Sequence, residues 1–196
     1  MAPTAQEAIT SYITDMVALE QHLQKALAGQ IEDLGDEQLF VSELRAIHAT
    51  CELHIAELER LANARGDSGQ GIAEAVKKAA STVLGFGAAA VDFVRTEKLP
   101  KNLRDDYTAV SLACIGYVML HTTALSLGDG ETAAVAHRHL RQHAQSTMAL
   151  HSIIPAAVVK FLQEDGLPAQ SGVLSEVADN IESVWQDDGG ITQGRD

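Results

Sequence analysis

The chain has 196 residues, which is enough for one domain with a modest core but too few for two large ones. Apolar residues make up 46% of it and aromatic residues only 4%, which favours close-packed helices over a β-sandwich. The 27 acidic residues outnumber the 14 basic ones, so the net charge is −13. An acidic surface argues against binding to nucleic-acid phosphates or anionic lipid, and we expect neither as a partner.

The two cysteines, Cys51 and Cys114, are too few for a disulfide-rich scaffold. The first residues contain no charged leader followed by an apolar stretch, as a signal peptide would. No segment approaches about 18 uninterrupted apolar residues, the length needed to span a membrane. We therefore expect a cytoplasmic protein with reduced thiols.

The first third of the sequence predicts a helical hairpin. Apolar residues recur at spacings of three, four and seven over roughly 5–34 and again over 37–64, as on one face of an amphipathic helix. Gly35 is typical of a helix end, and Asp36 is typical of the next helix start. So short a turn predicts that the two helices are antiparallel.

The pattern after residue 102 predicts a second hairpin. A helix over roughly 103–127 is apolar almost all round, so we expect it to be buried on several sides. After the turn at Leu127–Asp129, a fourth helix runs from Glu131 past residue 150, and Pro155 is expected to kink or end it. A short amphipathic helix is expected at 174–185.

These elements predict an all-α fold in which two antiparallel hairpins are joined by a long, partly helical crossover at about 66–102. A four-helix bundle with one long crossover has the ferritin-like connectivity. We expect the bundle to occupy 1–165, a C-terminal helical extension to occupy 166–186, and the tail at 187–196 to be flexible.

Polar residues on the apolar helix faces are the candidates for a functional site. Glu20 interrupts the stripe of the first helix, and Cys51 lies at the centre of the second, three residues before His54. Cys114 and His143 lie on the inward faces of the third and fourth helices. Counted from the two turns, Glu20, Cys51, Cys114 and His143 fall at one height, with His54 within one helical turn, if the hairpins are in register.

Each candidate also has an ordinary structural explanation. A buried Glu20 could be satisfied by a tyrosine or histidine, and Cys51 could be a small core residue. His137 and His139 belong to an Arg-His-rich run that is typical of a solvated helix face. The five candidates therefore favour a metal site without excluding a metal-free core.

Several segments resemble the ferritin-like stress-protein family of YciE and YciF type. The run Asp15–Leu27 resembles that family's first helix, D-x-x-x-A-E-K-Q-L-x-K-A-L, and places its metal-binding glutamate at Glu20. His48–Glu59 resembles H-L-E-E-T-x-x-Q-V-E-R-L-E in the second helix. Pro100–Asp105 is similar to P-x-L-R-D, and the turn at Leu127–Ala134 is similar to L-G-D-x-x-A-A. The similarity covers about residues 10–150 and implies a ferritin-like fold with a stress-related role.

The sequence departs from this family at the metal ligands. Ferritin-like di-iron sites need Glu-x-x-His motifs. The second helix has none, the third has no glutamate after Asp106, and the fourth carries Gln142 and His143 in the glutamate positions. We therefore do not expect a conventional di-iron centre or ferroxidase activity.

The leading hypothesis is a remodelled site that binds a transition metal, zinc or iron, and whose candidate ligands are Glu20, Cys51, His54, Cys114 and His143. One alternative is a metal-free structural or stress-related bundle without catalytic activity. The other is a thiol-redox protein that uses the two cysteines. Whether the protein is an enzyme stays open, with the balance against it, and we expect a homodimer.

Overall fold

The computed structural model describes residues 3–35, 37–65 and 98–186, and every element in these ranges is a helix. The fold is therefore all-α, as the sequence predicts. In chain order the helices are α1 (Ala5–Leu34), α2 (Gln38–Ala64), α4 (Lys98–Ser126), α5 (Gly130–Glu164) and α6 (Val173–Gln186). The expected crossover up to residue 97 and the tail at 187–196 lie outside the described residues.

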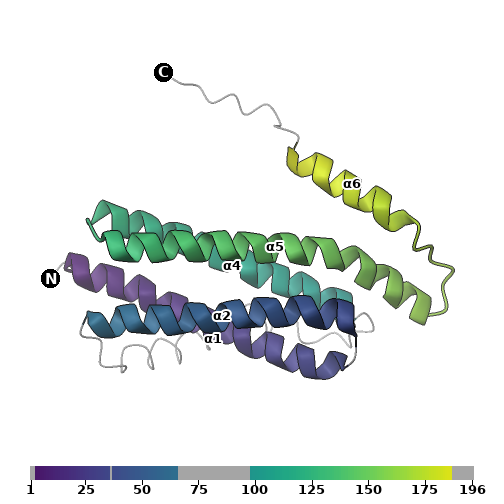
Figure 1. Cartoon of the computed structure of the whole chain (residues 1–196), viewed down its shortest axis with the longest axis horizontal. Helices are drawn as coiled ribbons and strands as arrows, with labels where there is room; N and C mark the ends of the chain where they lie inside the picture. Colours follow the sequence, from purple (N-terminus) through teal and green to yellow (C-terminus); the bar gives the residue numbers. More distant parts are fainter. Residues whose placement is uncertain (1–2, 36, 66–97, 187–196) are drawn as a thin grey trace, which may run out of the picture.

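Four long helices form two antiparallel hairpins that lie side by side, α1 with α2 and α4 with α5 (Figure 1). The end of α2 lies beside the α4–α5 turn, because Arg65 forms a salt bridge with Asp129. The end of α1 lies beside the start of α4, because Gln30 Nε2 donates a hydrogen bond of 2.8 Å to Asp106 Oδ1. The chain between residues 65 and 98 therefore joins opposite ends of the bundle.

The helix boundaries follow the capping signals. Thr4 and Glu7 form a capping box at the start of α1, in which each side chain bonds the other residue's backbone N–H. Gly35 follows the end of α1 at φ +56°, and Gly128 follows α4 at φ +77°, a region that glycine enters without strain. Asp129 caps α5 by accepting a backbone N–H from its first turn.

Two prolines lie within helices. α4 is described from Lys98, several residues before the expected start, so Pro100 lies inside the described helix. α5 continues through Pro155 to Glu164, so of the two expected effects of this proline, a kink or a helix end, the helix end is excluded. Ile153 and Ala157 on either side of this proline are buried, and their packing offsets the lost helical hydrogen bond.

The core is divided into two apolar clusters. One lies toward the α4–α5 turn and includes Ile9, Ile13, Leu61, Leu120 and Val135. The other lies toward the α1–α2 turn and includes Leu27, Phe40, Leu44, Leu103 and Leu150. The buried polar residues Glu20, His54 and His143 fall between these clusters along their helices. A polar layer therefore crosses the bundle near its middle.

One face of α4 is less buried than its sequence predicts. Five large apolar side chains on this helix are 42–59% exposed: Leu112, Ile115, Val118, Met119 and Leu125. By length and composition Leu99–Ser126 could cross a membrane, a test that core helices of soluble proteins also pass. In this structure α4 packs against α1 and α5. The exposed face would suit the expected homodimer, which stays a prediction.

Asp106 on α4 is 3% exposed, and its Oδ2 has no hydrogen-bond partner among the described residues. Burial raises the pKa of this carboxyl from 3.8 to about 7, because the hydrogen bond from Gln30 only partly offsets the desolvation. The folded protein therefore keeps this proton between about pH 4 and 7, where the unfolded chain releases it. Stability from the neutral carboxyl is complete at low pH and is lost as the pH rises through this range.

We predict that Asp106→Asn stabilises the protein at pH 8 by on the order of 3 kcal/mol, with little effect near pH 4. The amide keeps the acceptor for Gln30 and never ionises. Urea denaturation at both pH values measures the difference. Asp105→Asn, next to it but partly exposed, is the control. The charge of Asp105 contributes least to the raised pKa of Asp106, so this variant should show a much weaker pH dependence. Equal stabilisation at both pH values would contradict the raised pKa.

Candidate metal site

Glu20 is fully buried on α1 and receives hydrogen bonds from the three other long helices. Its Oε1 accepts from His54 Nδ1 of α2 at 2.8 Å, from Tyr117 Oη of α4 at 2.6 Å and from His143 Nε2 of α5 at 2.7 Å. Hydrogen bonds to a charged acceptor are stronger than neutral ones. A single carboxylate oxygen therefore links all four helices of the bundle.

Cys51 completes a group of three side chains that could hold a metal ion. Ligand atoms of Glu20, Cys51 and His143 all lie within 4.8 Å of one another, and all three residues are fully buried. Within the described ranges, Glu20 Oε2 and His143 Nδ1 have no hydrogen-bond partner. Unpaired buried polar atoms are costly, so their presence beside a thiol suggests a ligand.

Both ring nitrogens of His54 already have partners. Nδ1 bonds to Glu20, and Nε2 lies 3.0 Å from Gln142 Oε1. His143 differs because its Nδ1 is left without a partner among the described side chains. Both histidines therefore bond to Glu20, but only His143 keeps a ring nitrogen without a further hydrogen bond.

The charges around Glu20 fix the state of the metal-free site. Burial raises the pKa of Glu20, but the hydrogen bonds from His143 and His54 outweigh it and hold the pKa well below its ordinary value. Burial also raises the pKa of the Cys51 thiol, and the negative charge of Glu20 raises it further. At neutral pH the carboxylate is ionised and the thiol keeps its proton, so a metal ion would have to displace that proton.

The polar layer continues from His54 toward solvent. The ring of His139 stacks on that of His54 with 3.8 Å between centroids, and its Nε2 lies 2.9 Å from Glu57 Oε2. Burial and the neighbouring His54 lower the pKa of His139 to about 4. His139 is therefore neutral at pH 7, and its Nε2–H donates to the Glu57 carboxylate. Glu57 is 30% exposed, so this branch reaches the surface.

The expectation that His139 lies on a solvated helix face is wrong, because this residue is only 1% exposed. That expectation was based on the charged neighbours Arg138 and Arg141, which are typical of an exposed helix face. Arg138 instead bonds to Glu57 of α2, which covers this side of α5. Packing between the two hairpins, rather than the local charge pattern, decides the burial of His139.

The structure brings together three of the five candidate ligands and holds a fourth, His54, beside them. Cys114 does not join them: it is partly buried, and its Sγ lies 4.0 Å from Thr147 Oγ1. Tyr117, one turn further along α4, takes the place beside Glu20. Tyr117 was not among the predicted site residues, although it lies three residues after Cys114 and therefore on the same face of α4.

The chain matches no family model, and no curated protein or solved structure matches it. The resemblance to the ferritin-like stress proteins therefore stays a prediction. The case for the site rests on its geometry.

We predict that Glu20→Gln destabilises the metal-free protein by about 2–4 kcal/mol at pH 7, because three buried donors lose their charged acceptor. Urea denaturation in the presence of a chelator measures this loss. The exposed Glu52→Gln on α2 is the control and should change stability by less than about 0.5 kcal/mol.

The same pair of variants gives a pH test. The pKa of Glu20 lies below its ordinary value of 4.5, so the stability that the carboxylate contributes is complete above about pH 5 and declines as the pH falls below 4.5. The difference in the free energy of unfolding between the native protein and Glu20→Gln should therefore become smaller at acidic pH. A difference in the free energy of unfolding that stays constant from pH 7 to pH 3.5 would show that Glu20 is not the ionised carboxylate.

Proposed function

We propose that this protein is a ferritin-like bundle that binds one transition-metal ion through Glu20, Cys51 and His143. The observation that carries the proposal is the fully buried group of three, in which a carboxylate oxygen and a ring nitrogen lack other partners in the described structure. The connectivity supports the ferritin-like part, because the chain between α2 and α4 joins opposite ends of the bundle.

The donor set suits zinc best. Thiolate and imidazole are preferred zinc ligands, and a zinc ion held by these three residues would have a fourth coordination position left to fill. Ligand atoms around one zinc ion are about 3.5 Å apart, so the observed spacing of up to 4.8 Å would have to contract by about 1 Å. Iron is the second candidate, and it would be bound singly, since only one carboxylate is present in the group.

Burial favours a structural role for the ion. Glu20, Cys51 and His143 are each 0% exposed, so a bound ion would have no direct path for substrate. An ion held by residues of α1, α2 and α5 would stabilise the bundle by mass action, because the unfolded chain lacks the site. We infer a metal-dependent structural protein rather than a ferroxidase, and its stress-related role stays a prediction.

The metal-free bundle is the second candidate. It is favoured by the three hydrogen bonds that already satisfy Glu20 Oε1 without any ion. The thiol-redox alternative is less favoured, because the pKa values of both thiols are raised and the thiolate is the reactive form. The two leading candidates differ in whether an ion adds stability.

We predict that untagged protein stripped with a chelator takes up one equivalent of Zn²⁺ in a calorimetric titration. Cys51→Ser should weaken binding by at least tenfold, because the hydroxyl is a poor zinc ligand. Cys114→Ser makes the same chemical change outside the group of three and should bind as the native protein does. At about 100 times the dissociation constant, zinc should add about 2.7 kcal/mol to the free energy of unfolding.

Two results would overturn the proposal in favour of the metal-free bundle. One is the absence of zinc or iron uptake by protein that is folded by circular dichroism. The other is equal affinity for the native protein and Cys51→Ser, which would place the ion elsewhere on this acidic chain.

A further inference from the structure

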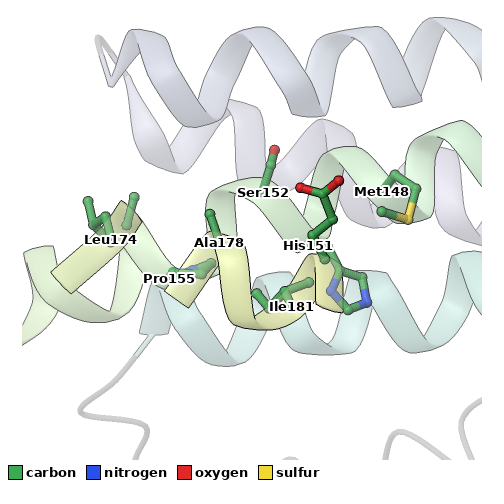
Figure 2. Close-up of a pocket in the computed structure, with 9 residues that line it drawn as sticks. Met148, His151, Ser152, Pro155, Leu174, Ala178 and Ile181 are labelled. Carbon is green, nitrogen blue, oxygen red and sulfur yellow. The ribbon is translucent and has the colours of Figure 1, made fainter. Parts of the chain in front are cut away.

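A cavity of about 480 Å³ lies between α5 and α6, outside the metal-site group (Figure 2). Its volume falls in the range of about 300–1,000 Å³ that is usual for small-molecule sites. Among the described helices α6 contacts only α5, so these two helices alone build the walls. The cavity is partly open to solvent, because Ala178 and Glu182 are exposed while Leu174 and Ile181 are partly buried.

The walls of the cavity are mostly apolar. On α6, Leu174, Ala178 and Ile181 are spaced by four and three residues, so they share one helix face. Met148 and Pro155 line the cavity from α5. Alanine at the middle of the α6 face leaves room that a larger side chain would fill.

The lining also includes the polar residues His151, Ser152 and Glu182. Figure 2 shows His151 and Met148 at one end of the cavity and Leu174 at the other. The ring of His151 is held against Tyr107 at 4.8 Å between centroids, in an edge-to-face contact. Glu182, which follows Ile181 on α6, places a carboxylate in the lining of the cavity. The site thus has an apolar part and a polar part.

The charge of this region favours a cation. The part of the lining that the structure describes includes Glu182 but neither a lysine nor an arginine. α6 has no basic residue over its whole length, and α5 has no lysine or arginine between Arg141 and Lys160. Lys160 forms salt bridges with two glutamates. Among the described lining residues an anionic ligand would meet no lysine or arginine, and the chain as a whole carries −13.

We propose that the cavity between α5 and α6 binds a small amphiphilic cation, with an apolar body against Leu174, Pro155 and Ala178 and an ammonium group at Glu182. The apolar body gains from leaving water, and the carboxylate attracts the head group. The assignment does not depend on the metal site, which lies in the middle of the four-helix bundle.

Calorimetric titration of the full chain with decylamine, decanol and decanoate at pH 7.4 tests this proposal. The three probes share one apolar chain and differ only in the charge of the head. A chelator in every solution keeps the metal site out of the measurement. We expect decylamine to bind tightest and decanoate at least tenfold more weakly.

Two variants on α6 locate the charge. Glu182→Gln should reduce the affinity for decylamine about tenfold and leave that for decanol unchanged. Glu176→Gln removes the same charge from the same helix, does not line the cavity, and should bind decylamine like the native protein. A third variant, Ala178→Phe, should block all three probes by filling the cavity.

The outcomes separate the charge assignment from the site itself. Decanoate binding as tightly as decylamine, or equal losses in both glutamine variants, would overturn the cation assignment. If none of the probes binds, or if Ala178→Phe binds them as the native protein does, this cavity is not a ligand site.

Discussion

The whole bundle depends on the buried carboxylate of Glu20. A carboxylate in a protein interior is costly unless it is paired, and here one oxygen accepts hydrogen bonds from His54, Tyr117 and His143 on three different helices. Sliding any of these helices by one turn, about 5.4 Å, would break a bond and leave a buried charge poorly compensated. The polar layer between the two apolar clusters therefore sets the register of all four helices.

Much of this layer can be predicted from the sequence, because local residue patterns set the helix bounds and the turns. Periodicity gives the bounds of α1 and α2 to within one residue, and the two glycine turns fix each hairpin. Counting from those turns places Glu20, Cys51 and His143 at one height, and the structure brings ligand atoms of these three residues together. An acidic residue within an apolar stripe is a strong signal, because few folds tolerate one without a partner.

What the sequence does not predict depends on how the two hairpins are rotated against each other. Cys114 was expected at the centre, but the rotation of α4 brings Tyr117 to Glu20 instead. The charges beside His139 are typical of a solvated helix face, but the packing of α2 against α5 buries this residue. The cavity beside α6 depends on the direction in which that helix turns back after α5, which no periodic pattern encodes.

The central claim is that this layer also binds a metal ion, with Cys51 as a ligand beside Glu20 and His143. X-ray absorption at the zinc edge of the zinc-loaded protein tests this most directly. We expect one sulfur neighbour, supplied by Cys51, at about 2.3 Å from the zinc ion, with nitrogen and oxygen neighbours at about 2.0–2.1 Å from it. A first shell of oxygen and nitrogen alone would contradict it and would leave the layer as a metal-free network of hydrogen bonds.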